Sequence, residues 1–307
     1  MQRLSLDQPL PGAFRAAIVA LGNFDGFHLG HQAVVGRAVA RGHHERRPVI
    51  VATFDPHPVR FFKPDLSPFR LTSLAQREQL FAHAGADAML VFRFDAALAA
   101  TSAEDFVTQL LARQIGAAAV VTGDDFTFGQ GRGGNVEVLR RLGLKVGIAA
   151  EAVAPVLLDG KRISSGLIRE ALEAGDPGTA TRLLSRPFAV EGAVERGDQR
   201  GRTLGYPTAN LRLGDYQRPA YGIYAGRARL DDEREYGAVI SLGVRPTFQP
   251  PVELLEAHLF DFDEDLYGRT IEVALHAFIR PEEKFADVAG LSARMKEDEA
   301  EARRLLA

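Results

Sequence analysis

The sequence predicts an α/β domain with a doubly wound parallel sheet, followed by an all-β domain and a closing helix. Between residues 16 and 150 short apolar runs alternate with helical stretches, which is typical of β-α-β units. From residue 188 onward short strand-like runs follow one another without helices between them. The change falls near residue 185, so we expect two domains, 1–185 and 186–307.

Five segments of the first half are almost continuously apolar, as expected for parallel strands that are buried on both faces. They are 16–22, 48–54, 87–94, 117–123 and 144–150. Two helices are expected after them, at 165–174 and 177–184. The second begins after Asp176-Pro177, a typical cap followed by a first-turn proline.

The second half has short runs, several of them alternating between apolar and polar residues, separated by turns rich in Gly, Pro and Asp. These runs are 188–195, 222–230, 236–243, 252–260 and 270–279. They predict an antiparallel sheet or barrel. A last helix is expected from about 291 to 306, with Ser292 as its cap.

Composition excludes several classes of protein. The 307 residues include no cysteine, which excludes disulfides, zinc–thiolate sites, iron–sulfur clusters and thiol nucleophiles. A net charge of -3 offers no overall attraction for nucleic acid or an anionic membrane. The chain shows neither an apolar run of membrane-spanning length nor the apolar core of a signal peptide. We therefore expect a cytoplasmic protein without a nucleic-acid, membrane or obligate protein partner.

A glycine-rich turn with two histidines joins the first expected strand to the first helix. Gly22 and Gly26 of this LGNFDGFHLGHQ stretch (21–32) allow a ligand to approach the backbone closely. His28 and His31 lie three residues apart at the helix start, where both imidazoles can face one anion. Such donors suit a triphosphate whose α-phosphorus is under attack. The alternative is a pair of surface histidines after a turn.

A second phosphate signal lies in ISSGLIR (163–169). Ser164 and Ser165 stand at an expected helix start, and Arg169 lies one turn later, where its guanidinium can bind a phosphate. The alternative is an ordinary helix cap with a solvated arginine. Together with the histidine motif, the phosphate interpretation becomes stronger.

Two further loops follow expected strands. In TFDPHPVRFF (53–62) two prolines fix the backbone around His57. In GDDFTFGQGRGG (123–134) Asp125 can bind a ribose or an adenine amine, and Phe126 and Phe128 can flank a planar ring. The alternative is that the phenylalanines belong to the core and the carboxylates only form a turn.

The second half opens with GRTLGYPTANLRL (201–213). Gly201 and Gly205 make a flexible turn, and Thr208 and Asn210 alternate along an extended segment, so both can face the same side. A hydroxyl and an amide oxygen are suitable ligands for Mg²⁺ beside a nucleotide phosphate. The alternative is a structural role for both side chains.

Glu256 lies in the VELLEAHLF segment, on the face opposite to Leu255, Ala257 and Leu259. The leucine and alanine face must point into a core, so the carboxylate meets solvent or a ligand. A carboxylate on a rigid strand can accept a hydroxyl proton during phosphoryl transfer. The alternative is an ordinary exposed strand glutamate.

Eight segments in order carry a resemblance to a known family. They are LGNFDGFHLGHQ (21–32), TFDPHP (53–58), GDDFTFG (123–129), ISSGLIR (163–169), GRTLGYPTAN (201–210), GVRPTF (243–248), LEAHLFDFDEDLYG (255–268) and FIRPEEKF (278–285). In these, essentially the whole chain resembles the bacterial bifunctional riboflavin kinases/FMN adenylyltransferases, also called FAD synthetases. The resemblance implies an N-terminal nucleotidyltransferase domain of the HxGH type and a C-terminal flavokinase β-barrel.

The resemblance also implies roles for individual residues. It implies catalytic roles for His28, His31 and Glu256, nucleotide or phosphate binding by Gly22, Phe24, Gly26, Ser164, Ser165, Arg169, Gly201, Thr203 and Gly205, flavin binding by His57, Asp125, Phe126, Phe128 and Arg280, and Mg²⁺ ligation by Thr208 and Asn210. Two positions depart from the family pattern: Gly166 replaces a threonine, and Ser241 stands where many relatives have asparagine.

The expected function is flavin cofactor synthesis in two steps. Riboflavin and ATP give FMN and ADP in the second domain, and FMN and ATP give FAD and pyrophosphate in the first, both with Mg²⁺. One rival is that the first domain adenylylates another phosphate monoester. A flavokinase-like half on the same chain disfavours this. A second rival is a flavin-binding regulator without turnover, which the intact His28, His31 and Glu256 disfavour.

Overall fold

The computed structural model describes residues 1–197, 205–245 and 252–307 of the chain. It divides into two compact units. The first comprises residues 1–67 and 74–163, and the second comprises 68–73 and 164–307. The packing therefore divides the main chain at 163/164 rather than at the predicted boundary of 185. The boundary of the two activities at 185 stays a prediction.

The first unit contains a six-stranded sheet. Its strands are β1 (Gln2–Leu4), β2 (Ile18–Leu21), β3 (Val49–Asp55), β4 (Ala88–Arg93), β5 (Ala119–Gly123) and β6 (Ala149–Val153). They lie in the order β1-β4-β3-β2-β5-β6, and every neighbouring pair is parallel. This confirms the doubly wound fold.

The helices and minor elements of this unit lie between and after these strands. They are η1 (Gly12–Phe14), α1 (Leu29–Glu45), α2 (Pro58–Phe62), α3 (Leu74–His83), α4 (Ala96–Ala100), α5 (Ala103–Asp105), the π-helical η2 (Phe106–Ile115), η3 (Gln130–Arg132), α6 (Val136–Lys145) and the hairpin strands β7 (Leu157–Leu158) and β8 (Lys161–Arg162). The strand expected at 144–150 begins only at Ala149. Its first residues form the last turn of α6, because a short apolar run fits either element.

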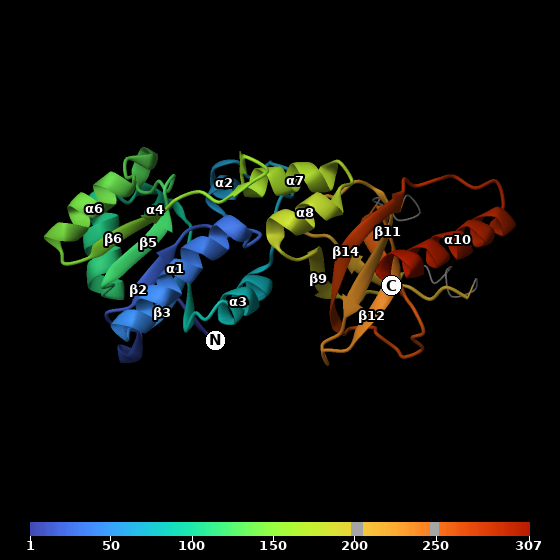
Figure 1. Ribbon diagram of the computed structural model, residues 1–307, viewed down its shortest axis with the longest axis horizontal. Coiled ribbons are helices and arrows are strands. Elements are labelled where there is room, and N and C mark those ends of the chain that lie inside the picture. The colour runs from blue at the N-terminus through green and yellow to red at the C-terminus, as the bar shows by residue number, and fades with distance from the viewer. Residues whose placement is uncertain (198–204, 246–251) are drawn as a thin grey trace. The chain divides into compact units, whose positions relative to one another are not determined.

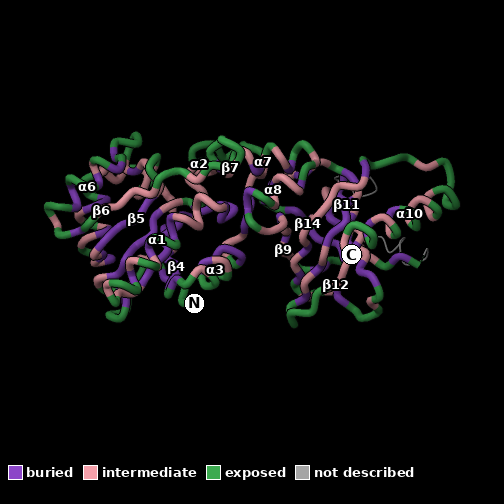
Figure 2. Tube along the Cα trace, viewed as in Figure 1, coloured by how far each residue is buried: buried purple, intermediate pink, exposed green. Residues whose placement is uncertain are grey.

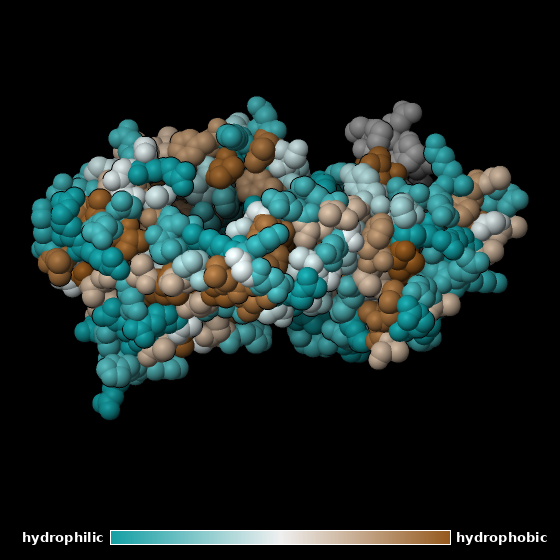
Figure 3. Space-filling view, turned by 45° about the horizontal axis from the view of Figure 1, so that its top comes forward, coloured by the Kyte–Doolittle hydropathy of each residue, from teal (hydrophilic) through white to brown (hydrophobic). Residues whose placement is uncertain are grey.

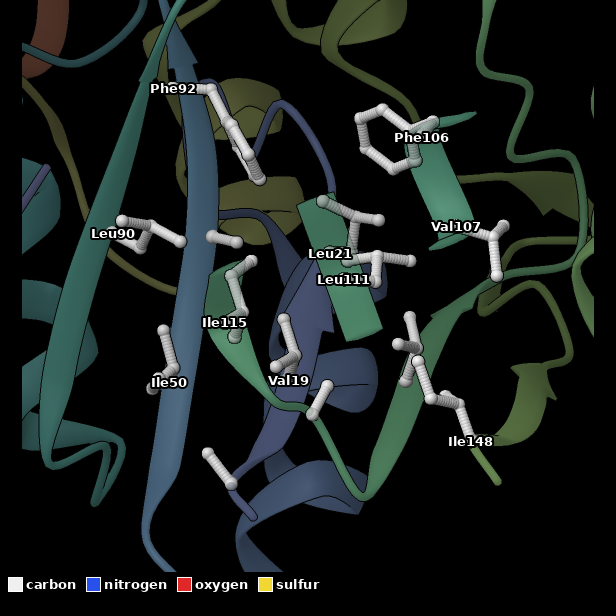
Figure 4. Packing of buried hydrophobic residues seen from close by; sticks show 14 of the residues in the cluster. Val19, Leu21, Ile50, Leu90, Phe92, Phe106, Val107, Leu111, Ile115 and Ile148 are labelled. Carbon is white, nitrogen blue, oxygen red and sulfur yellow. The ribbon is translucent and has the colours of Figure 1, made fainter. Parts of the chain in front are cut away.

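Alternate residues of β2 point to opposite faces of the sheet and enter two separate cores. Val19 and Leu21 pack with η2, as Figure 4 shows, where Leu111 and Ile115 lie over the strands. Ile18 and Ala20 pack with α1 on the other face. The inner strands β2, β3, β4 and β5 are largely buried (Figure 2), whereas the edge strands β1 and β6 are mostly exposed or half-buried. Covering both faces fixes the strand ends, from which the loops of the candidate site emerge.

The second unit contains an antiparallel sheet. Its strands are β9 (Phe188–Ala193), β10 (Ala209–Arg212), β11 (Gly222–Arg229), β12 (Glu235–Arg245), β13 (Val252–Leu259) and β14 (Thr270–Arg280). They lie in the order β10-β13-β12-β11-β14-β9. The amide of Glu195, just beyond β9, donates to the carbonyl of Asn210 in β10 over 2.9 Å. This bridge joins the two edges, so the sheet is a nearly closed barrel, as predicted.

The described residues of the second unit form the helices α7 (Ser165–Glu173), α8 (Pro177–Leu184) and α10 (Val288–Leu306). Asp176 caps α8 as predicted, accepting from the Thr179 amide over 2.8 Å. The prediction that Ser292 caps the last helix is wrong. Asp287 caps it one turn earlier by accepting from the Gly290 amide over 2.7 Å. Ala302 of α10 then packs against the barrel, along which this helix lies in Figure 1.

Apolar side chains on the surface lie in small separate groups among hydrophilic residues on the face that Figure 3 shows. Within the described parts of the chain, none of the helices combines the length and the apolar character needed to cross a membrane.

Candidate active sites

The direction in which the chain adds strands reverses between β2 and β5. After β2 the chain adds β3 and β4 on one side, and it then crosses to add β5 and β6 on the other. The loops that follow β2 and β5 therefore diverge, which is where doubly wound folds bind ligands. The histidine motif follows β2, and the Asp125 loop follows β5. Because β2 and β5 pair in parallel, both loops leave the same edge of the sheet.

His28 is the N-cap of α1, which begins at Leu29. Its Nδ1 accepts from the His31 amide over 3.3 Å, and the two imidazole rings stack with centroids 3.6 Å apart. Since Nδ1 accepts, the neutral ring carries its proton on Nε2, which makes that nitrogen a donor. The stacked pair thus stands at the positive end of a 17-residue helix. This arrangement can stabilise negative charge on a phosphate.

The glycines of the motif leave room for aromatic rings. A Cβ at Gly30 would lie 3.1 Å from Cε1 of His28, and a Cβ at Gly22 would lie 3.1 Å from the Phe24 ring. Gly26 has a φ of 83°, which favours glycine. Phe24 is 1% exposed, so its ring belongs to the core. Gly22 is half-buried and Gly26 is buried, so the nucleotide-binding roles of Gly22, Phe24 and Gly26 stay predictions.

The loop after β5 is tied to the β8 hairpin strand. Nη2 of Arg162 lies 3.0 Å from Oδ1 of Asp124 and 2.9 Å from Oδ1 of Asp125. The phenylalanines differ from each other: Phe128 is buried, whereas Phe126 is half-buried and stacks on it with centroids 5.7 Å apart. The core interpretation therefore holds for Phe128. Sequence reasoning missed Arg162, which had no motif around it.

The loop after β3 presents His57 and an exposed aromatic ring. His57 is the N-cap of α2, and its Nδ1 accepts from the Val59 amide over 3.2 Å. Phe62 is 65% exposed, although its ring contacts Phe61 and Phe94 edge-on. An exposed phenyl group at the carboxyl edge of a sheet suits a planar ligand such as a flavin ring. Sequence reasoning named His57 and missed Phe62, although the Phe-Phe pair closes the same motif.

Ser164, Ser165 and Arg169 begin and follow the first turn of α7 in the second unit. Ser164 Oγ accepts from the Leu167 amide over 3.3 Å, which is an ordinary capping bond. Nε of Arg169 donates to the Phe69 carbonyl over 2.8 Å. Their phosphate-binding role stays a prediction. Ile163 precedes Ser164 and closes the first unit near the histidine motif, since a Cβ at Gly30 would lie 3.8 Å from the Ile163 carbonyl oxygen.

Glu256 stands in the middle of three neighbouring barrel strands. It is directly opposite Asn210 of β10 on one side and Ser241 of β12 on the other. Directly opposed residues of an antiparallel pair lie on the same face of the sheet. Leu255 and Ala257 are fully buried, whereas Glu256 is half-buried. The predicted orientation of the Glu256 carboxylate, away from the apolar core face, is confirmed.

A pocket of about 360 Å³ lies beside these residues. It is lined by Val194, Pro207, Thr208, Ala209, Asn210, Ala257, Leu259 and the loop residues 262–267. The loop contributes the rings of Phe262 and Tyr267 and the carboxylates of Asp263, Glu264 and Asp265. Thr208 and Asn210 both line the pocket, and their role as cation ligands stays a prediction.

Asn210 is suited to hold a cation. It is 5% exposed, and its Oδ1 has no hydrogen-bond partner among the described residues. A buried amide oxygen without a partner costs free energy unless a ligand satisfies it. A Cβ at Gly197 would lie 2.7 Å from Nδ2 of Asn210, so this glycine, which sequence reasoning missed, lets the amide fit. Within the described ranges no three His, Asp or Glu side chains form a cluster that could hold a metal ion.

Ion pairs from other elements hold the loop that walls the pocket. Arg234 binds both oxygens of Glu264 over 2.5 and 2.9 Å and lowers the pKa of that carboxyl. Arg303 of α10 binds both oxygens of Asp261 over 2.9 and 3.1 Å and lowers its pKa as well. The loop is therefore fixed at two points while its rings line the pocket.

Gly201, Thr203, Gly205 and Arg280 are the remaining residues of the second half that were predicted to contact a ligand. Gly205 lies in a turn with a φ of 82°, as a flexible turn requires. Gly201 and Thr203 lie outside the described residues. Arg280 is buried, and its guanidinium binds both oxygens of Asp298 and the Pro281 carbonyl. These bonds tie β14 to α10, and a flavin contact of Arg280 stays a prediction.

Two families match the two halves of the chain. The FAD synthetase family matches residues 11–167, and the riboflavin kinase family matches residues 184–306. Both matches follow the order of motifs in the sequence.

Whole-chain relatives agree with this division. The bifunctional riboflavin kinase/FMN adenylyltransferase of Escherichia coli K12 is 38% identical over 93% of this chain and 91% of its own length. The Pseudomonas fluorescens protein of the same name is 38% identical over 95% and 94%. A crystal structure described as a macrolide-efflux protein from Streptococcus pneumoniae is 30% identical, covers 99% of both chains and has a TM-score of 0.87. With these relatives, the chain belongs to the family of bifunctional riboflavin kinases/FMN adenylyltransferases.

Proposed function

We propose that the barrel transfers the γ-phosphate of ATP to the terminal hydroxyl of the ribityl chain of riboflavin, and that the first unit then adenylylates the FMN. The observation that supports the kinase assignment is the pairing of Glu256 with Asn210 beside the pocket. It combines a carboxylate base with a buried oxygen ligand on adjacent strands. Both are needed to activate a hydroxyl next to a metal-bound phosphate.

The kinase step requires one proton acceptor. Glu256 takes the proton of the ribityl hydroxyl as its oxygen attacks the γ-phosphorus, and the bond from that phosphorus to the β-phosphate oxygen breaks to release ADP. Because Glu256 projects from the central strand of three, its carboxylate is held in place by the sheet. A base placed this way contributes typically about 10²–10⁴-fold to the rate.

Thr208 and Asn210 would hold Mg²⁺ in the barrel. The Oδ1 of Asn210, which has no hydrogen-bond partner in the described part of the chain, and the neutral hydroxyl of Thr208 are oxygen ligands of the kind Mg²⁺ prefers. When bound, Mg²⁺ neutralises charge on the phosphate oxygens. Replacing Asn210 by alanine is expected to raise the Mg²⁺ concentration that half-saturates the kinase, with no change for FAD formation.

The pocket suits the nucleoside end of ATP. Phe262 and Tyr267 offer rings to the base, and the carboxylates of the same wall can accept hydrogen bonds from hydroxyl and amino groups. Among the described residues that line it are three carboxylates and no cationic side chain, so a triphosphate inside is disfavoured by like-charge repulsion. The phosphates are therefore expected at the Thr208 and Asn210 end.

The kinase assignment is tested with Glu256→Gln, which removes the base and keeps the shape of the side chain. Riboflavin phosphorylation should fall at least about 100-fold, whereas conversion of supplied FMN to FAD should stay at the parental rate. Glu235→Gln, at an exposed position of the same barrel, is the matched control and should change neither. An unchanged kinase rate in Glu256→Gln would show that Glu256 is an ordinary strand glutamate and not the base.

In the first unit, a phosphate oxygen of FMN attacks the α-phosphorus of ATP, and the bond to the β-phosphate breaks to release pyrophosphate. The stacked His28 and His31 at the start of α1 can donate to the phosphate oxygens that gain charge. The exposed Phe62 and the loop of Asp125 lie on the same edge of the sheet and are expected to contact the flavin. Ser164, Ser165 and Arg169 are expected to bind phosphate.

The adenylyltransferase assignment is tested with His28→Asn combined with His31→Ala. Asparagine keeps an acceptor at the N-cap of α1, so the helix start is retained while both imidazoles are lost. FAD formation should disappear while riboflavin still becomes FMN. If the folded variant makes FAD at the parental rate, the histidines are not catalytic.

The two proposed reactions consume riboflavin, FMN and ATP and form FMN, FAD, ADP and pyrophosphate, with Mg²⁺. They need no nucleic acid, membrane or obligate protein partner, and their substrates are those of the cytoplasm.

A further inference from the structure

The loop that follows β2 adopts an unusual backbone. Phe24 and Phe27 have φ values of 51° and 42°, in the left-handed region that bulky side chains rarely occupy. Such conformations cost free energy and persist only where the surroundings hold them. This loop leads directly into His28, so whatever holds it also sets the position of the imidazoles.

Helix α3 supports this loop with two side chains one turn apart. Phe81, which is fully buried, packs edge-on against Phe24 and Phe27 with ring centroids 5.7 and 5.1 Å apart. Arg77 lies four residues earlier, so it projects from the same face of the helix. The apolar contact alone does not fix the peptide group at the start of the loop.

Arg77 fixes that peptide group. Its Nη1 donates to the carbonyl of Asn23 over 3.2 Å and to Oγ1 of Thr53 over 2.9 Å. Thr53, at the end of β3, donates in turn to the same Asn23 carbonyl over 2.8 Å. The carbonyl thus receives two hydrogen bonds, one from α3 and one from β3, immediately before the left-handed Phe24.

Burial of Arg77 is costly for a purely structural side chain. It is 3% exposed, and Thr53 is fully buried. A hydrocarbon of similar volume would fill the same space without the cost of desolvating a guanidinium group. The cost of burying the Arg77 guanidinium is expected where the backbone geometry that it holds is needed for function.

We propose that Arg77 is a positioning residue for adenylyl transfer, which acts through His28 by fixing the Asn23 peptide. This inference rests on the proposed role of the histidines. Loss of Arg77 should leave the substrates able to bind while the donors are displaced from the charged transition state. Small misplacements of this kind cost up to about 100-fold in rate.

The experiment measures both activities of the full-length Arg77→Met protein. We expect kcat of FMN adenylylation to fall about 10- to 100-fold, with KM for FMN and ATP changed less than about threefold. Riboflavin phosphorylation by the same chain should be unchanged and is an internal control for folding and concentration. Arg77→Lys, which keeps a donor and the charge, should recover most of the lost rate.

A double variant separates positioning from a general structural effect. If Arg77 acts through His28, then adding Arg77→Met to His28→Asn should lower the adenylylation rate little further. The inference would be overturned if the double variant lost rate by the product of the two single losses. A parental kcat of adenylylation in Arg77→Met would also overturn it. If His28→Asn alone has no effect, the proposed function of the histidines fails instead.

Thr53→Val provides the same test without removing the buried cation. Valine has the shape of threonine and suits a strand, so the fold should be retained even if Arg77→Met is too unstable to assay. We expect a smaller loss of kcat in the same direction, again absent in the His28→Asn background. If Arg77→Met is too unstable to assay while Arg77→Lys is fully active, a parental adenylylation rate in Thr53→Val would also overturn the inference.

Discussion

Arg280 of β14 and Asp298 of α10 form a buried ion pair inside the second unit. Nε and Nη2 of Arg280 donate to the two carboxylate oxygens over 2.8 and 2.6 Å, and the side chains are 9% and 5% exposed. A buried pair with this bidentate geometry contributes little compared with an apolar pair, but loss of one partner leaves an uncompensated charge. The pair therefore makes the attachment of α10 sensitive to either residue.

We predict that Asp298→Asn destabilises the second unit by up to about 3–5 kcal/mol, because the buried Arg280 then keeps only the exposed Glu283 carboxylate, 3.6 Å away, as a counter-charge. Urea unfolding followed by kinase activity measures this. Glu301→Gln, which breaks an exposed pair with Arg304 on the same helix, should cost at most about 1 kcal/mol. Equal effects of the two variants would contradict the structural role assigned to the buried pair.

A second prediction concerns the glycine beside His28. An alanine at position 30 places its Cβ 3.1 Å from the His28 ring, so the imidazole must move. Gly30→Ala should therefore lower kcat of adenylylation about tenfold or more, with the kinase rate unchanged.

Gly36 is the matched control on the same helix, since a Cβ there would meet no atom within 4 Å. Gly36→Ala should keep both activities and stabilise the helix by up to about 1 kcal/mol. An active Gly30→Ala protein would show that the His28 ring tolerates displacement.

The elements that the sequence predicted well are those whose local pattern has one interpretation. The runs that became β2, β3 and β5 are apolar throughout and bounded by turns. The run at 144–150 fits either a strand or a helix. Its first residues are helical because α6, which Asn135 caps, runs through Lys145. The Ser292 cap failed for a similar reason, since Asp287 also satisfies the rule and lies one turn earlier.

The candidate sites were predicted as residues but not as neighbours. Thr208 and Asn210 were singled out as a pair in one segment and Glu256 in another, and the position of Glu256 relative to the pair was not predicted. That Asn210 and Glu256 lie directly opposite each other depends on strand register, which long-range packing sets. Arg77 was missed because a helix arginine gives no signal until the fold shows which carbonyl it meets.

A third prediction concerns Gly166, where the family pattern has threonine. Gly166 lies in the first turn of α7, and a Cβ there would meet only Ser164 Oγ at 3.5 Å, so a larger side chain fits. The threonine hydroxyl of the family pattern is expected to bind a phosphate. Gly166→Thr should then lower KM for ATP in FAD formation about five- to tenfold, the typical effect of one hydrogen bond. Gly166→Val has the same shape without the hydroxyl. An equal effect of both variants would exclude a phosphate contact.

The last prediction concerns where the chain can be cut. The change of pattern near residue 185 predicts that fragment 186–307 folds alone, whereas the packing assigns α7 and α8 to the second unit. The buried residues of these helices include Ile168, Leu172, Leu183 and Leu184. The Leu172 carbonyl also accepts from the Ala220 amide over 2.9 Å, just before the barrel strand β11.

Fragment 164–307 should therefore be the more stable of the two. Removing four buried aliphatic side chains forfeits about 1.5–3 kcal/mol each, which is comparable to the whole stability of a domain. We expect 164–307 to unfold cooperatively in urea and to phosphorylate riboflavin, and 186–307 to unfold at much lower urea with little or no activity. Equal midpoints and equal kinase rates would show that α7 and α8 are dispensable to the barrel and that the predicted boundary at 185 is also a boundary of folding.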